Sequence, residues 1–63
     1  MEIIVESSSS EKTKFGNVET AVEYIKRRVS ENFVVYVKAG SQTQQIINEI
    51  KKSCYNVLSV ESR

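Results

Sequence analysis

The sequence predicts a small α/β protein, a two-layer β-α-β-α-β sandwich in which two helices cover one face of a small three-stranded, mainly parallel sheet. Short apolar runs with β-branched residues occupy residues 2–6, 33–37 and 56–61, as in strands. The segments between them carry apolar residues at helical spacing. Strands that alternate with helices are typical of crossover connections and a parallel sheet. We expect a single domain spanning residues 1–63.

The N-terminal region is predicted to be one strand followed by a loop. Residues 2–6, EIIVE, form the strand. Residues 7–16, SSSSEKTKFG, are polar, show no apolar period and end in glycine, which is typical of a flexible loop. We interpret the four serines as a solvated linker in preference to a phosphorylation site.

A helix is predicted over residues 18–30. Asn17 suits the N-cap position, and Glu23 and Arg27 have the spacing of a favourable ion pair along a helix. The basic residues near residue 28 suit the negative end of the helix dipole. One face of this helix is apolar and consists of Val18, Ala21, Val22, Ile25 and Val29.

The second half of the chain is predicted to be strand, helix and strand. Five consecutive apolar residues, Phe33 to Val37, indicate a central strand covered on most of both faces. Gly40 ends this strand, and Ser41 is expected to cap the second helix. The buried face of that helix is predicted to hold Ile46, Ile47, Ile50 and Cys54. The last strand is expected at about residues 56–61.

Size and composition restrict the ways in which the fold can be stabilised. The chain has 63 residues, one cysteine and no histidine, so an intrachain disulfide and a zinc site are both excluded. We expect no cofactor and no metal. Because a domain of this size has a marginal core of its own, we expect a homodimer.

Composition also argues against several functions. Nine Lys and Arg against eight Glu give a net charge of +1, which is not strongly basic. No apolar run approaches a membrane span and no signal peptide is visible, so we expect a cytoplasmic protein that does not insert in membranes. Without His or Asp, and with Cys54 expected in the core as a small hydrophobe, we predict that the protein is not an enzyme.

The corner at Gly40 is the best candidate for a site. Gly40 alone is a turn residue, but small polar side chains follow it at the positive end of a helix, where free N–H groups bind anions. In a parallel sheet the loops after the first two strands share one edge, so we expect the lysines of the first loop to converge on this corner. The predicted nucleic-acid-binding residues are Lys12, Lys14, Lys38, Gly40, Ser41 and Gln42.

Phe15 lies beside these lysines and has two interpretations. It could stack on a base. It could also pack against the N-terminal turn of the first helix as a hydrophobic staple, which is the interpretation we favour.

Two stretches resemble the Alba superfamily of small nucleic-acid-binding proteins of archaeal chromatin and RNA metabolism. NVETAVEYI resembles the start of the first Alba helix, and VVYVKAGSQTQQII resembles its strand-glycine-helix corner. The bacterial stage V sporulation protein S is similar in the same places. The resemblance implies a homodimer that binds DNA or RNA without sequence preference. Lys38 is retained at the corner, while Ser41 and Gln42 stand where the family commonly has arginine.

Two alternatives remain open. The order of elements, with the ending YNVLSVE, is similar to the TusA-type sulfur carriers, whose Cys-Pro pair is replaced here by FGNVE; that resemblance implies a degenerate carrier without its cysteine. The near-neutral charge also fits a protein-interaction module that binds no nucleic acid.

Overall fold

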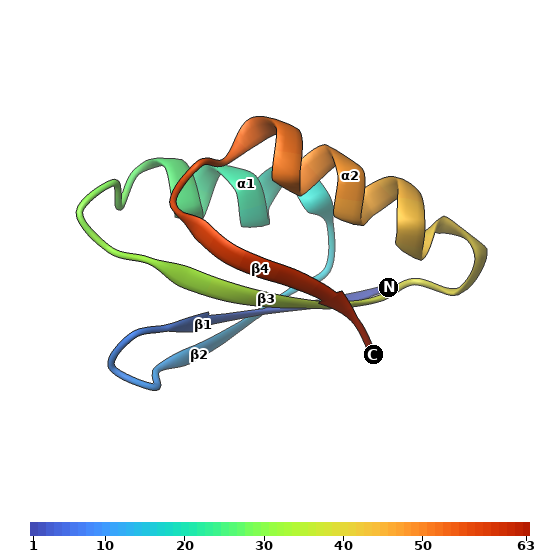
Figure 1. Cartoon of the computed structure of the whole chain (residues 1–63). Coiled ribbons are helices and arrows are strands. Elements are labelled where there is room, and N and C mark those ends of the chain that lie inside the picture. The colour runs from blue at the N-terminus through green and yellow to red at the C-terminus, as the bar shows by residue number, and fades with distance from the viewer.

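The computed structural model covers residues 1–63 and has the element order ββαβαβ. The four strands form one sheet in the order β2-β1-β3-β4, and both helices lie on one face of it (Figure 1). The protein is thus a small α/β protein with a four-stranded mixed sheet. The elements are β1 (Glu2–Ser7), β2 (Lys12–Phe15), α1 (Val18–Lys26), β3 (Phe33–Lys38), α2 (Thr43–Ser53) and β4 (Val57–Ser62).

The predicted loop over residues 7–16 is wrong, because it contains a second strand. β1 and β2 form an antiparallel hairpin around a tight serine turn. Within this turn the Ser7 N–H donates to the Glu11 carbonyl at 2.9 Å and the Ser10 N–H to the Ser7 carbonyl at 3.0 Å. Ser10 adopts a positive φ of 69°. The consecutive serines therefore form the hairpin turn instead of a linker.

The predicted three-stranded, mainly parallel sheet is also wrong. β1 runs antiparallel to both β2 and β3, and β3 and β4 are parallel. The hairpin is the physical reason, because it reverses the chain before α1 begins. The crossover through α1 therefore connects β2 to β3 and passes over β1, while the crossover through α2 connects the neighbouring strands β3 and β4.

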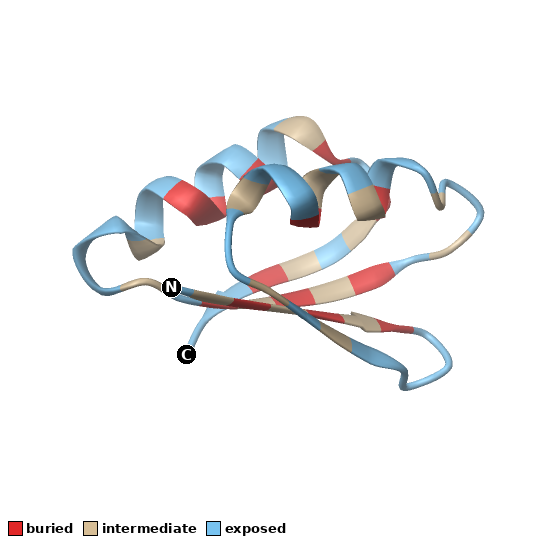
Figure 2. Cartoon of the chain, turned by 180° about the vertical axis from the view of Figure 1, so that it is seen from behind, coloured by how far each residue is buried: buried red, intermediate tan, exposed pale blue.

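The core lies between the sheet and the helices, and Figure 2 shows the buried residues as alternating bands along the strands. Phe33, Val35 and Val37 of β3 are at most 1% exposed. Val34 and Tyr36 lie between them on the opposite face and are only half-buried. The expectation that both faces of this strand are covered is therefore wrong, since no second layer packs on the other side.

Helix α1 begins as predicted but is shorter than predicted. The Asn17 Oδ1 accepts the Thr20 N–H at 2.9 Å, which confirms the N-cap. The helix ends at Lys26, and Val29 is 64% exposed instead of buried. The buried side chain of Asn56 donates to the carbonyls of Ile25, Arg28 and Glu31 at 3.0–3.1 Å. These bonds fix the chain in a loop where the helical pattern would have continued.

Helix α2 confirms the predicted apolar face. Ile46, Ile47, Ile50 and Cys54 are all at most 6% exposed. Neither this helix nor α1 has the length and apolar character needed to cross a membrane.

Candidate nucleic-acid interface

One face of the sheet carries no helix and is open to solvent (Figure 1). Side chains alternate between the two faces of a sheet, and the buried residues of β1 and β3 mark the covered face. The residues between them define the open face. On β1, β2 and β3 these are Glu2, Ile4, Glu6, Lys12, Lys14, Val34, Tyr36 and Lys38.

The register of the strands places all three predicted lysines on this open face. Lys12 lies opposite Glu6 and Lys14 opposite Ile4 in the hairpin. Lys38 lies opposite Glu2 on the other side of β1. Directly opposed residues share a face, so the structure brings the three lysines to one surface. It does so through the sheet and not, as expected, through loops at one edge.

The Gly40 turn lies at one end of this face and the serine turn at the other. Because β1 and β3 are antiparallel, the end of β1 lies beside the start of β3, and the expectation of a shared edge is wrong. Lys38 lies at the Gly40 end, and Lys14 is level with Tyr36. Lys12 is level with Val34, about 13 Å along the strands from Lys38.

Acidic side chains lie among these lysines. Lys14 Nζ is 3.2 Å from Glu2 Oε2, and the two side chains are 69% and 37% exposed. An ion pair this exposed contributes little to stability and leaves the ammonium accessible. The glutamates Glu2 and Glu6 belong to the inner strand β1, whereas the lysines lie on the edge strand β2 and at the end of β3. Lys12 and Lys14 therefore lie along one edge of the face, while the exposed Glu61 lies on the opposite edge strand, β4, beside Tyr36.

Tyr36 occupies the centre of the open face. It lies opposite Ile4 of β1 and Glu61 of β4. The Arg63 guanidinium carbon is 5.0 Å from the centroid of the Tyr36 ring, a cation–π distance. An aromatic ring with a guanidinium beside it is the type of platform on which unpaired bases stack.

The Gly40 corner differs in detail from the prediction. Gly40–Gln42 form a single 3₁₀ turn before α2, and Gly40 has a φ of 58°. Ser41 does not cap the helix, and Gln42 at the N-cap makes no side-chain bond. The Thr43 hydroxyl instead accepts the Ala39 N–H at 2.9 Å. Gly40, Ser41 and Gln42 are all exposed, so the corner is open to solvent.

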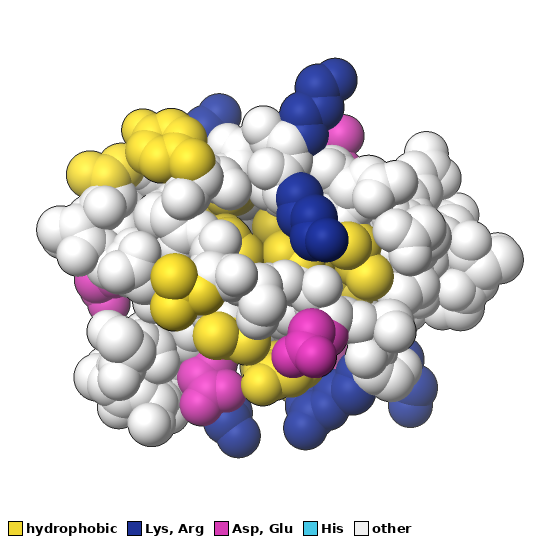
Figure 3. All heavy atoms as spheres, viewed as in Figure 1, with side chains coloured by type: hydrophobic (Ala, Val, Ile, Leu, Met, Phe, Trp, Pro, Cys, Tyr) yellow, Lys and Arg dark blue, Asp and Glu magenta, His cyan; other side chains and the backbone are white.

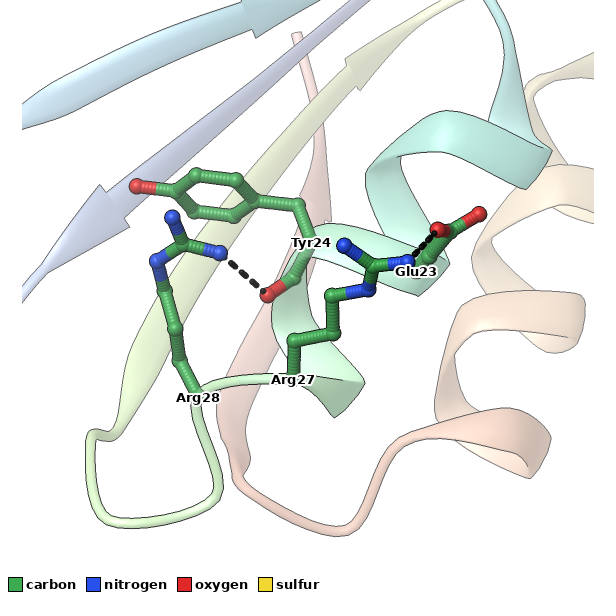
Figure 4. A network of polar contacts seen from close by, with 4 residues as sticks. All are labelled: Glu23, Tyr24, Arg27 and Arg28. Atoms are coloured by element: carbon green, nitrogen blue, oxygen red, sulfur yellow. Dashed lines mark hydrogen bonds and ion pairs between the residues drawn. The ribbon is translucent and has the colours of Figure 1, made fainter.

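The two arginines that follow α1, Arg27 and Arg28, interact with residues of their own layer. Arg27 Nη2 is 2.7 Å from Glu23 Oε1, as the spacing predicted. The Arg28 guanidinium lies 3.8 Å from the centroid of the Tyr24 ring and donates to the Tyr24 carbonyl at 3.2 Å (Figure 4). Arg28 therefore stabilises the end of α1, whereas the exposed Arg27–Glu23 pair contributes little. Both arginines lie in the helical layer, away from the open face.

Two further predictions concern packing. The Phe15 ring packs on the ring of Tyr24 with 5.2 Å between centroids. Phe15 therefore contacts α1 near the end of the helix and not at its N-terminal turn, where the staple interpretation placed it. Cys54 is 4% exposed, and burial raises the pKa of its thiol while the nearby Lys26 charge opposes this. A thiol held neutral in the core is a poor nucleophile.

No group of His, Cys, Asp or Glu side chains is arranged to hold a metal ion. The groove between the helices is lined by Val18, Val22, Lys26 and Glu49 among others and carries both charges.

No family model, curated protein or solved structure matches this chain. The resemblances to the Alba superfamily and to the TusA-type carriers therefore stay predictions.

Sequence reasoning missed three residues that matter. Tyr36 and Arg63 join the lysines on the open face, and the alternation within FVVYVK is a signal that could have indicated Tyr36. The buried Asn56, which joins α1 and the loop after it to the start of β4, gives no recognisable pattern in the sequence.

Proposed function

We propose that this chain is a small, non-enzymatic protein that binds DNA or RNA through the open face of its sheet, without sequence preference. The observation that supports the proposal is the strand register, because it gathers Lys12, Lys14 and Lys38 on one solvent-facing surface around Tyr36. The cytoplasmic location and the relationship to Alba belong to the same proposal.

The geometry favours a single strand over a duplex. Lysines at the margin of the face contact phosphates, which fixes position without reading sequence. Tyr36 at its centre offers a ring on which any base can stack. A duplex hides its bases and would use only the lysines. Mixed charge on the face leads us to expect modest affinity, about 10⁻⁴–10⁻⁶ M at physiological salt.

Salt and charge reversal test this proposal together. Anisotropy of a labelled oligothymidine should show a slope of about −2 in log K against log salt if three lysines contact phosphates. Replacing Lys14 and Lys38 by Glu should weaken binding at least about tenfold. The matched control replaces Lys51 and Lys52 of α2 by Glu, which alters net charge equally on the helical layer. Equal affinities for the two double variants would contradict the proposed site.

A protein-interaction module is the second candidate, and one observation favours it. Ile4, Val34 and Tyr36 form a half-buried apolar strip across the open face, with Glu2 and Glu6 beside it. Mobility of labelled single-stranded and duplex DNA at about 50 mM salt separates the two functions, since non-specific binding is strongest at low salt. If neither the single-stranded nor the duplex probe shifts, the result favours the protein partner.

A further inference from the structure

We infer that two copies of this chain pair through their β4 edges, antiparallel and centred on Val60, to form one continuous eight-stranded sheet. The two edges of the sheet differ. β2 has four residues, of which Lys12 and Lys14 are charged, and lysines on a short strand discourage pairing with another chain. β4 has six residues, with Glu61 as its single charge.

The β4 side also exposes apolar surface. Leu58 is 71% exposed and Tyr55, just before the strand, is 90% exposed. Figure 3 views the molecule from this side and shows hydrophobic side chains at the surface over β4 and between β4 and α2. The register shift between Phe33 and Val34 places one extra residue, Leu58, in β4. This bulge leaves Leu58 uncovered, and the strand is regular from Ser59 onward.

The hydrogen bonds within the sheet show which backbone groups of β4 are free. The Arg63 N–H donates to the Val37 carbonyl at 2.9 Å. Residues two apart in a strand direct their backbone groups the same way, so Ser59 and Glu61 also face β3. Val60 and Ser62 therefore direct their N–H and C=O groups outward, away from the sheet.

These outward groups fix the register of self-pairing. A two-fold axis through Val60 places Val60 opposite the partner's Val60 as a hydrogen-bonded pair, and Ser62 opposite the partner's Leu58. Ser59 then lies opposite the partner's Glu61, so no like charges meet. An axis at Glu61 would oppose two carboxylates, which is unfavourable. An axis at Ser59 would leave Ser62 outside the paired segment.

The same register covers Leu58. Leu58 becomes the diagonal neighbour of the partner's Val60, which is within reach of a long side chain. Because the axis is perpendicular to the sheet, both helical layers lie on one side and both open faces on the other. If the proposed function holds, one nucleic-acid strand can cross two adjacent sets of lysines; the pairing itself does not depend on that function.

Sedimentation equilibrium of the full chain, without nucleic acid, tests the inference. The wild type should show a concentration-dependent dimer. Leu58→Lys should raise the dissociation constant at least about tenfold, because it replaces buried apolar surface by charge on both sides of the axis. The matched control is Val29→Lys, which makes the same change at a residue that is 64% exposed outside the β4 edge. Circular dichroism checks that both variants are folded.

Cross-linking tests the register. Residues directly opposite in an antiparallel pair lie within the reach of a disulfide, so a Ser59→Cys/Glu61→Cys variant should oxidise to a covalent dimer. Wild type, with its buried Cys54, should not, and Ser59→Cys alone should cross-link poorly. A wild type that is monomeric at every concentration would overturn the inference. Equal weakening by the Leu58 and Val29 variants, or a dimer whose double-cysteine variant does not cross-link, would overturn it as well.

Discussion

The two faces of the sheet are built from the same strands, but they place opposite demands on their side chains. On the covered face Ile3, Val5, Val35 and Val37 are at most 1% exposed, and each must fill a fixed volume against the helices. On the open face Ile4, Val34 and Tyr36 are half-buried among charges. Residues of the covered face therefore determine stability, whereas those of the open face can vary and are available for binding.

Two aromatic residues of β3 provide the strongest test of this difference. Phe33 is 1% exposed. Its replacement by Ala should lower the free energy of unfolding by about 3–5 kcal/mol. A domain of this size has about that much stability in total, so the variant should be largely unfolded in urea titration. Tyr36→Ala is the matched control on the open face. It should stay folded and lose nucleic-acid affinity by about tenfold. Equal stabilities of the two variants would contradict the assignment of faces.

Substitutions of Asn56 test how much the helical layer contributes to stability, because they change no side chain on either face of the sheet. Its side-chain amide donates to three carbonyls and is 7% exposed. Asn56→Ala removes all three bonds and should cost about 1–3 kcal/mol, although the carbonyls of Ile25 and Arg28 still accept backbone N–H groups. Asn56→Asp keeps the shape but cannot donate when ionised, so it should be at least as unstable at neutral pH. Denaturant titration measures both changes, and affinity per folded molecule should not change.

Substitution of Gly40 should have the smallest effect on the free energy of unfolding. Its φ of 58° is unfavourable for other residues, while a Cβ there would have no atom within 4 Å. Gly40→Ala should therefore cost about 1 kcal/mol from backbone conformation alone. Gly16→Ala is the control, since Gly16 also has open space but no positive φ. A larger loss of affinity than of stability at Gly40 would show that the turn itself contacts nucleic acid.

The covered face and its helices could be predicted because their residues are apolar at the right spacing. β2 could not, since KTKF has only four residues and two are charged. Thr13 and Phe15 alternate with the lysines, but four serines before them suggest a loop more strongly than that alternation suggests a strand. Without this strand the predicted sheet topology is wrong as well, because the hairpin sets the direction of β3 and β4 relative to β1.

The lysines of the candidate site could be named from the sequence, but the reason for their proximity could not. Their convergence depends on cross-strand register. The serine turn sets the register of Lys12 and Lys14 in the hairpin, whereas Lys38 is placed by the pairing of β1 with β3. Tyr36 lies inside an apolar run in which only Tyr36 and Lys38, two residues apart, distinguish the open face. Arg63 reaches Tyr36 only because β4 runs parallel to β3.

The chain ends are neighbours in space. Glu2 lies opposite Lys38, and Arg63 bonds to Val37, so both termini flank the same end of β3 at a separation of about two strand spacings, or ~10 Å (Figure 1). A linker of a few residues could close the chain into a ring, and the exposed turn at residues 8–11 offers a place to reopen it as a circular permutant. An affinity tag fused at either end would emerge beside Lys38, so a faithful binding assay requires that the tag be removed.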